Sequence, residues 1–250
     1  MKKYSVMTVF NHAYAKKHGE DWIKSFYDKV DLKKVNNIFI VDTGLNDQDI
    51  DMFSKYEKVK LVDAEFKNQK TTKTALERDT TKDSLWVQHV LQKTKNLKKL
   101  VDGGNYPLVM VDGDCKFLKD FSHIITNDDV QVCKNQRVEH CGINGEGYQG
   151  GQMPLGYIGC YFSVNTEKGI SFLGEWISEI NRLVKDQNFK WYETPSLCRL
   201  MSNQETHSKY NIGMVPQSLV AAEEKIHLDE NSLIQHLKTT AYKGGIFNDR

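Results

Sequence analysis

The sequence predicts a single α/β domain of 250 residues with a mixed, mostly parallel sheet flanked by helices. Short apolar segments rich in β-branched residues alternate with longer segments in which apolar residues recur at helical spacing. This alternation is typical of sheets in which a helix connects each strand to the next parallel strand. The sequence shows no internal repeat, low-complexity tract or linker, so one domain with two unequal halves is the simplest organisation.

Strands and helices alternate through the first half of the chain. Its predicted strands span residues 4–10, 37–42, 59–63 and 107–111. Apolar residues at helical spacing predict helices over residues 22–30, 50–56 and 86–101. The segment 66–82 is polar and rich in threonine, which predicts a loop. The short apolar run at 37–42 is typical of a strand buried on both faces, and the strand at 107–111 is the most apolar of the set.

The second half has shorter strands and a glycine-rich segment. Its predicted strands span residues 130–133, 157–164, 212–215 and 233–236. The apolar stripe over 170–184 predicts the clearest helix, and Thr194-Pro195 is a pattern for an N-cap followed by proline at the first helical position. The glycines of residues 141–152 are too frequent for regular structure and predict a loop.

Composition and charge exclude several classes of protein. The net charge is +1, from 34 basic and 33 acidic residues, which argues against a general nucleic-acid binder. No stretch approaches the roughly 18 apolar residues of a membrane span. Five cysteines without a Cys-x-x-Cys pair disfavour a disulfide framework or a zinc ribbon. We therefore expect free thiols, a cytoplasmic location and no membrane span.

The most specific feature is Asp112-Gly113-Asp114, which follows the strand at 107–111 directly. Ligands bind at the carboxyl ends of strands in open α/β sheets, and two carboxylates this close repel unless a cation lies between them. Mn²⁺ and Mg²⁺ accept such carboxylates together with phosphate oxygens. The alternative is that both aspartates only cap a turn. Similar pairs within residues 47–51 fall in a predicted solvated helix start, where acidic residues complement the helix dipole.

The segment 109–118 resembles the Asp-x-Asp segment of GT-A type glycosyltransferases, the nucleotide-diphospho-sugar transferases, in which the motif follows the fourth strand. The segment 38–45 is similar to the second strand and turn of that family, and 157–165 to the strand that carries its acceptor-side glycine. The resemblance implies a Rossmann-like GT-A domain. Residues 1–115 would form its nucleotide-sugar-binding half and residues 116–250 its acceptor-binding half.

The resemblance also implies a cofactor and a set of site residues. Mn²⁺ or Mg²⁺ would be held by Asp112, Asp114 and His236 against the diphosphate of a UDP- or GDP-linked sugar donor. The acidic residue Glu193 opens a helix beside the acceptor, which would be a glycan or another hydroxyl compound. The expected nucleotide-sugar-binding residues are Thr8, Phe10, Asn11, Asp42, Asp63, Lys82, Asp112, Gly113, Lys238 and Lys243.

These expectations describe a metal-dependent glycosyltransferase. If the reaction inverts the anomeric centre, a carboxylate must take the proton of the acceptor hydroxyl, and Glu193 is the candidate; a retaining reaction needs no such base. Closure of residues 141–152 over the site would exclude water. Two alternatives remain at this point: a metal-dependent phosphatase or phosphohydrolase that uses Asp112 and Asp114, and a catalytically inactive GT-A-like binding module.

Overall fold

The computed structural model describes residues 3–68, 85–134, 157–186, 193–223 and 228–237. Within this part of the chain, a seven-stranded sheet has the strand order β3-β2-β1-β4-β7-β6-β8. These strands are β1 (Tyr4–Phe10), β2 (Val35–Asp42), β3 (Val59–Asp63), β4 (Leu108–Val111), β6 (Val130–Lys134), β7 (Tyr157–Val164) and β8 (Ile212–Pro216). All neighbouring pairs are parallel except those of β7, which runs antiparallel to both β4 and β6. The predicted mixed, mostly parallel sheet is confirmed.

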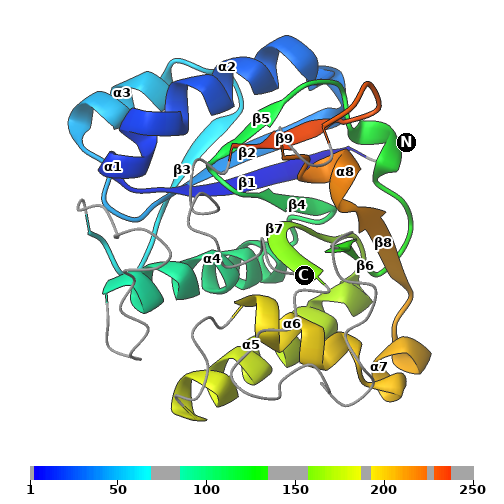
Figure 1. The fold of residues 1–250 in the computed structure, drawn as a ribbon. Helices are drawn as coiled ribbons and strands as arrows, with labels where there is room; N and C mark the ends of the chain where they lie inside the picture. The colour runs from blue at the N-terminus through cyan, green and yellow to red at the C-terminus, as the bar shows by residue number, and fades with distance from the viewer. Residues whose placement is uncertain (1–2, 69–84, 135–156, 187–192, 224–227, 238–250) are drawn as a thin grey trace, which may run out of the picture.

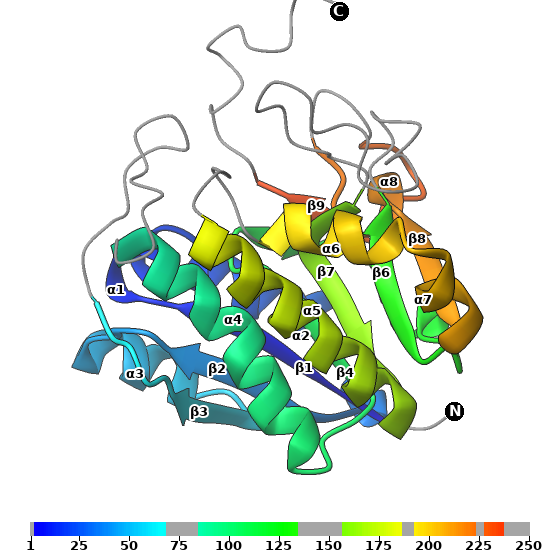
Figure 2. The ribbon, with the colours of Figure 1, turned by 90° about the horizontal axis from the view of Figure 1, so that it is seen from below.

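Helices cover both faces of this sheet (Figure 1). On one face lie α1 (His12–Tyr14), α2 (Glu20–Lys29) and α3 (Asp47–Ser54), and on the other lie α4 (Leu85–Asp102), α5 (Glu167–Asp186) and α6 (Glu193–Met201). Figure 2 shows α4 and α5 lying next to each other across the second face. The short helices α7 (Gln204–Lys209) and α8 (Gln217–Val220) flank β8.

Each face of the sheet has its own apolar core. Trp22, Phe26 and Phe53 pack on one face, and all three are fully buried. Leu97 and Trp176 pack on the opposite face and are also fully buried. The four residues of β4 are buried as well, because this strand lies between β1 and β7 and is covered on both sides. Its uninterrupted apolar sequence is what such a central position requires.

Several features differ from the sequence predictions. A strand that was not predicted, β5 (Cys115–Phe117), pairs antiparallel with β9 (Ile234–His236) in a separate small sheet. Helix α6 begins at Glu193, so Thr194 lies inside the helix and is not its N-cap. Asp49 is not solvated: it is 7% exposed, because it forms a capping box with Asn46 and also bonds His12.

Among the described residues, no helix combines the length and the apolar character that crossing a membrane requires.

Candidate active site

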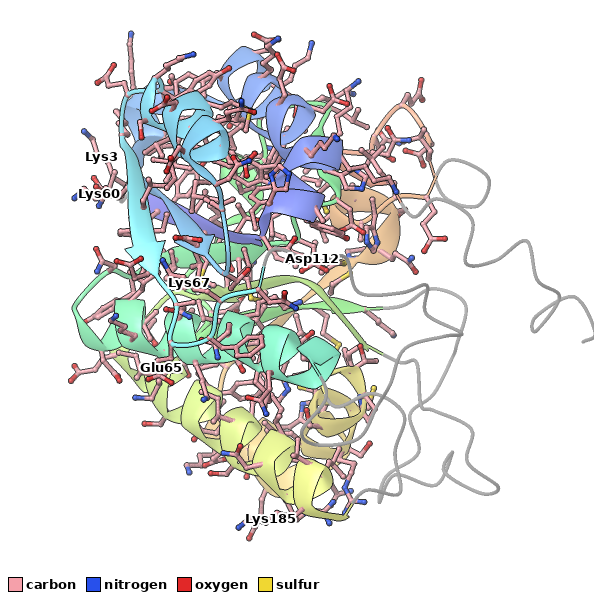
Figure 3. The ribbon with its side chains drawn as sticks, turned by 90° about the vertical axis from the view of Figure 1, so that its left-hand side faces the viewer. Lys3, Lys60, Glu65, Lys67, Asp112 and Lys185 are labelled. Atoms are coloured by element: carbon pink, nitrogen blue, oxygen red, sulfur yellow. The ribbon has the colours of Figure 1, made fainter. Side chains whose placement is uncertain are left out.

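The Asp112–Asp114 turn lies at the carboxyl end of β4, between the two layers of helices (Figure 3). Backbone hydrogen bonds fix its start: the amide of Asp112 donates to the carbonyl of Cys160 on β7 at 2.9 Å. The indole nitrogen of Trp22 on α2 donates to the Asp112 carbonyl at 3.1 Å. The turn is therefore anchored to the sheet on one side and to a buried aromatic residue on the other.

Gly113 is required by the close approach of this turn to β1. A Cβ atom at this position would lie 2.7 Å from Cε1 of Phe10 and 3.1 Å from the carbonyl oxygen of Val9. Phe10 cannot move easily, since it is fully buried and its ring stacks on Phe53 with centroids 5.3 Å apart. Only glycine lets both flanking aspartates sit directly over the end of β1.

The structure brings together the three residues predicted to bind metal. One ligand atom each from Asp112, Asp114 and His236 all lie within 4.8 Å of one another. The pairing of β5 with β9 places His236 opposite Cys115, so that His236 Nε2 is 3.3 Å from Asp114 Oδ1. Two carboxylates and one imidazole are a donor set suited to a divalent cation such as Mn²⁺. The residues present therefore fit the predicted cation.

Asp114 is held in its ionised form. Burial alone would raise the pKa of this carboxyl, but the neighbouring charge and hydrogen bond of His236 and a hydrogen bond from Tyr14 lower it well below its usual range. The pKa of Tyr14 is raised by burial and by the neighbouring Asp114 carboxylate, so its hydroxyl stays protonated. A deprotonated carboxylate is the form that binds a metal.

Lys93 on α4 links the turn to Glu193, and sequence reasoning missed it. Its Nζ lies 2.8 Å from Asp112 Oδ1 and 3.0 Å from Glu193 Oε2, and it donates to the Gly159 carbonyl at 2.9 Å. Burial would lower the pKa of this ammonium, but Asp112 and Glu193 raise it above its usual value. One sequence signal was available. Lys93 lies four residues before Leu97 and therefore on the apolar face of its helix, where a charged side chain is unexpected.

Glu193 opens α6 beside Lys93, with its side chain 14% exposed. Trp176 Nε1 and Ser196 Oγ both donate to its carbonyl oxygen, at 3.2 and 2.8 Å, which fixes the start of the helix. Burial raises the pKa of the Glu193 carboxyl to about 7, although Lys93 opposes the shift. A Cβ on Gly159 would lie 3.5 Å from Glu193 Oε2, so this glycine of β7 adjoins the carboxylate.

The three candidates at the end of β1 are either buried or cap the following helix. Thr8 and Phe10 are fully buried. The side chain of Asn11 caps α1, because its oxygen accepts the amide of Tyr14 at 2.9 Å while its nitrogen donates to the Asn68 carbonyl at 3.0 Å. These contacts hold the strand end and the following helix in place.

Asp42 and Asp63 share one lysine. Lys67 lies 2.5 Å from a carboxylate oxygen of each, and the other oxygen of Asp42 accepts the amides of Gly44 and Leu45 at 2.8 and 2.7 Å. Both aspartates thus have partners at the ends of β2 and β3, where Figure 3 labels Lys67. The remaining candidates and the predicted loop lie outside the described residues: Lys82, Lys238, Lys243 and residues 141–152.

No protein-family model matches the chain, and no curated protein matches it in sequence. Solved structures nevertheless share its fold. The galactosyltransferase LgtC, in complex with donor and acceptor sugar analogs, aligns with a TM-score of 0.57 and 10% identity over 95% of this chain and 88% of its own. Mouse xyloside xylosyltransferase 1 aligns with a TM-score of 0.57 and 10% identity over 94% of this chain and 97% of its own.

The bifunctional glycosyltransferase WbbM aligns with a TM-score of 0.54 and 14% identity over 87% of this chain. The aligned region is only 39% of the WbbM chain, so the present chain spans well under half of that larger protein. At these identities the similarity concerns the fold. Together with the sheet order and the position of the Asp112–Asp114 turn, it shows that the chain has a GT-A type fold, which it shares with these glycosyltransferases.

Proposed function

We propose that this protein is a metal-dependent glycosyltransferase that moves a sugar from a nucleoside diphosphate donor to an acceptor hydroxyl. The observation that carries the proposal is the cluster of Asp112, Asp114 and His236 at the carboxyl edge of a GT-A sheet, with Glu193 linked to it through Lys93. Ligands of open α/β sheets bind at this edge. The proposed donor is UDP- or GDP-linked, and the proposed acceptor is a glycan or another hydroxyl compound.

The two halves of the chain take different roles in this proposal. Residues 1–115 supply Asp112 and Asp114 and bind the donor, whereas residues 116–250 supply His236 and Glu193 and bind the acceptor. A bound Mn²⁺ or Mg²⁺ would stabilise the negative charge that develops on the departing diphosphate. The fold similarity to LgtC, whose structure holds donor and acceptor sugar analogs, supports a sugar donor and a sugar acceptor.

Glu193 is the proposed base of an inverting reaction. Its pKa of about 7 lies near neutral pH, where a carboxylate accepts a proton from a hydroxyl group most effectively. A retaining reaction would leave Glu193 without a proton-transfer step, and its carboxylate would then serve to hold Lys93. The anomeric configuration of the first product, read by proton NMR, distinguishes the two reactions.

A thermal-shift screen with Mn²⁺ and a panel of nucleotide sugars tests the proposal. A ligand that binds only the native state stabilises it by about 2.7 kcal/mol at about 100 times its Kd, which corresponds to a shift of about 5–10 °C in a chain of this size. Asp114→Ala should abolish the metal-dependent part of the shift. The control is Asp51→Ala on α3, which removes an exposed carboxylate and should leave the shift unchanged.

The same assay separates the alternatives. Absence of a shift with any nucleotide, together with phosphate release from a simple phosphomonoester, would favour a metal-dependent phosphatase. Binding of a nucleotide sugar without turnover on any acceptor would favour an inactive binding module. An unchanged metal-dependent shift in Asp114→Ala would exclude Asp114 as a ligand.

A further inference from the structure

One turn of α2 holds the loop that carries both aspartates at the two ends of that loop. The indole nitrogen of Trp22 donates to the Asp112 carbonyl at 3.1 Å. One turn further along α2, the hydroxyl oxygen of Ser25 accepts the amide of Phe117 at 3.1 Å. The loop of residues 112–117 therefore runs between two hydrogen bonds to the same helix.

The two anchors on α2 are joined to each other and packed against the loop. Trp22, Ser25 and Phe26 share one face of the helix, because they are three and four residues apart. The Ser25 hydroxyl donates to the Trp22 carbonyl at 3.1 Å. The ring of Phe117 lies edge-on to those of Trp22 and Phe26, with centroids 5.1 and 4.9 Å apart. All four side chains are buried, so the loop cannot shift without breaking buried hydrogen bonds and close packing.

The same helix also controls the place of the third candidate ligand. The end of the loop is β5, which pairs with β9 so that Cys115 lies opposite His236 and Phe117 opposite Ile234. Since Ser25 holds the Phe117 amide, the position of this small sheet is tied to α2. The helix thus supports all three candidate ligands through the main chain, although its own residues are not among the three that cluster.

We propose that Trp22 and Ser25 are positioning residues, which set the geometry in which the three clustered side chains hold a divalent cation. This inference rests on the proposed function, because it requires that the cluster binds a cation. Groups that orient metal ligands from outside typically contribute about 10- to 100-fold to metal affinity. Here the orienting hydrogen bonds go to the main chain of the loop, so they fix the places from which the carboxylates extend.

Manganese binding tests the proposal without any need for donor or acceptor. Free Mn²⁺ is measured by electron paramagnetic resonance during titration of the full chain, which gives both the Kd and the number of sites per chain. Ser25→Ala and Trp22→Phe should each raise the Kd about 10-fold, because each releases one end of the loop. In Trp22→Phe the Asp112 carbonyl keeps the amide of Cys115 at 3.2 Å, so the variant loses the anchor without leaving an unpaired acceptor.

The number of sites separates positioning from a purely structural role. A residue that only stabilises the fold would lower the number of sites per chain through unfolding and would leave the Kd of the folded chains unchanged. The matched control is Ser202→Ala. Ser202 is 7% exposed, against 6% for Ser25, and its hydroxyl likewise donates within its own helical segment, to the Cys198 carbonyl at 2.7 Å. Its loss should leave the Kd unchanged.

The possible outcomes fall on different parts of the proposal. A wild-type Kd in Ser25→Ala or in Trp22→Phe would overturn the positioning role of that residue and leave the cation site standing. An equal rise of the Kd in Ser202→Ala would also overturn the role of Ser25, because it would show a general effect of a lost buried hydroxyl. A wild type that does not bind Mn²⁺ would overturn the metal-dependent function and this inference with it.

Discussion

Lys93 carries one positive charge between two carboxylates that come from distant parts of the chain. Its side chain is 12% exposed, and those of its partners Asp112 and Glu193 are 26% and 14% exposed. Coulomb interactions are stronger in such a poorly solvated site than at the surface, and an unpaired charge there is costly. Lys93 therefore stabilises both the proposed metal ligand and the proposed base.

Replacement of Lys93 by methionine should destabilise the protein by about 3–5 kcal/mol, because two poorly solvated carboxylates lose their counter-ion. Urea denaturation measures the change in unfolding free energy. The control on the same helix is Lys98→Met, which breaks an ion pair with Asp102 whose side chains are 33% and 48% exposed. This control should cost less than about 1 kcal/mol. Similar costs for the two variants would show that the Lys93 pairs contribute little.

The raised pKa of Glu193 predicts a pH dependence of stability. The native carboxyl has a pKa of about 7 instead of 4.5, so between these values the native state binds more protons at this site than the unfolded state. The contribution of this group to stability is therefore present below pH 4.5 and is lost as the pH rises through 7. Glu193→Gln is neutral at all pH values and lacks this dependence.

Denaturant melts in EDTA at pH 5 and pH 8 check this prediction. The wild type should lose more unfolding free energy between the two pH values than Glu193→Gln does. An equal loss would show that the Glu193 pKa is close to its ordinary value in the native state. If Glu193 is also the base of the reaction, kcat/KM should rise through about pH 7, because only the ionised form accepts a proton.

The turn between β4 and β5 depends on one glycine. Gly113→Ala would place a Cβ 2.7 Å from the buried ring of Phe10, and overpacking of this kind costs about 1–3 kcal/mol. The variant should also weaken Mn²⁺ binding, because relief of the contact moves Asp112 and Asp114. The control is Gly174→Ala on α5, where the added Cβ meets nothing within 4 Å. That substitution should stabilise the helix by about 0.5–1 kcal/mol.

Elements with a strong local signal were predictable from the sequence. The apolar run that forms β4 and the apolar stripe that forms α5 lie where their patterns place them. β5 was not predictable, because a strand of three residues has no period of its own and exists through its pairing with β9. Helix boundaries that are set by tertiary contacts were also not predicted. Helix α6 begins at Glu193, where the side chains of Trp176 and Ser196 donate to the Glu193 carbonyl.

The same distinction applies to the site. Asp112 and Asp114 could be predicted, because their motif follows a recognisable strand. His236 was predicted only through the family resemblance, since the pairing of β5 with β9 that places it beside the aspartates has no local signal. Lys93 was not predicted: its place on an apolar helix stripe is a weak signal, and its partner groups lie 19, 66 and 100 residues away in the sequence. Asp42 stays a predicted nucleotide-sugar-binding residue; the sequence did not show that one of its carboxylate oxygens accepts the amides of the turn that follows.

At the scale of the whole molecule, the cysteines report on several elements of the fold at once. Cys115, Cys133, Cys160 and Cys198 are buried, and each is at most 1% exposed. They come from β5, β6, β7 and α6, so no single local opening of one element exposes all of them. Burial also raises the pKa of the Cys115 thiol well above its usual value, which suppresses the reactive thiolate.

These four thiols should therefore react with Ellman's reagent in the native protein no faster than the fold opens, whereas all five thiols of the chain should react at once in denaturant. The absorbance of the released thionitrobenzoate measures the labelling rate in the native protein and in denaturant. Cys141 lies outside the described residues, so the comparison is repeated with Cys141→Ser, which removes any contribution of that thiol. Rapid labelling of any of the four in native Cys141→Ser would contradict the buried positions. Slow labelling at one common rate would show that the elements that carry these cysteines open together, as one cooperative domain requires.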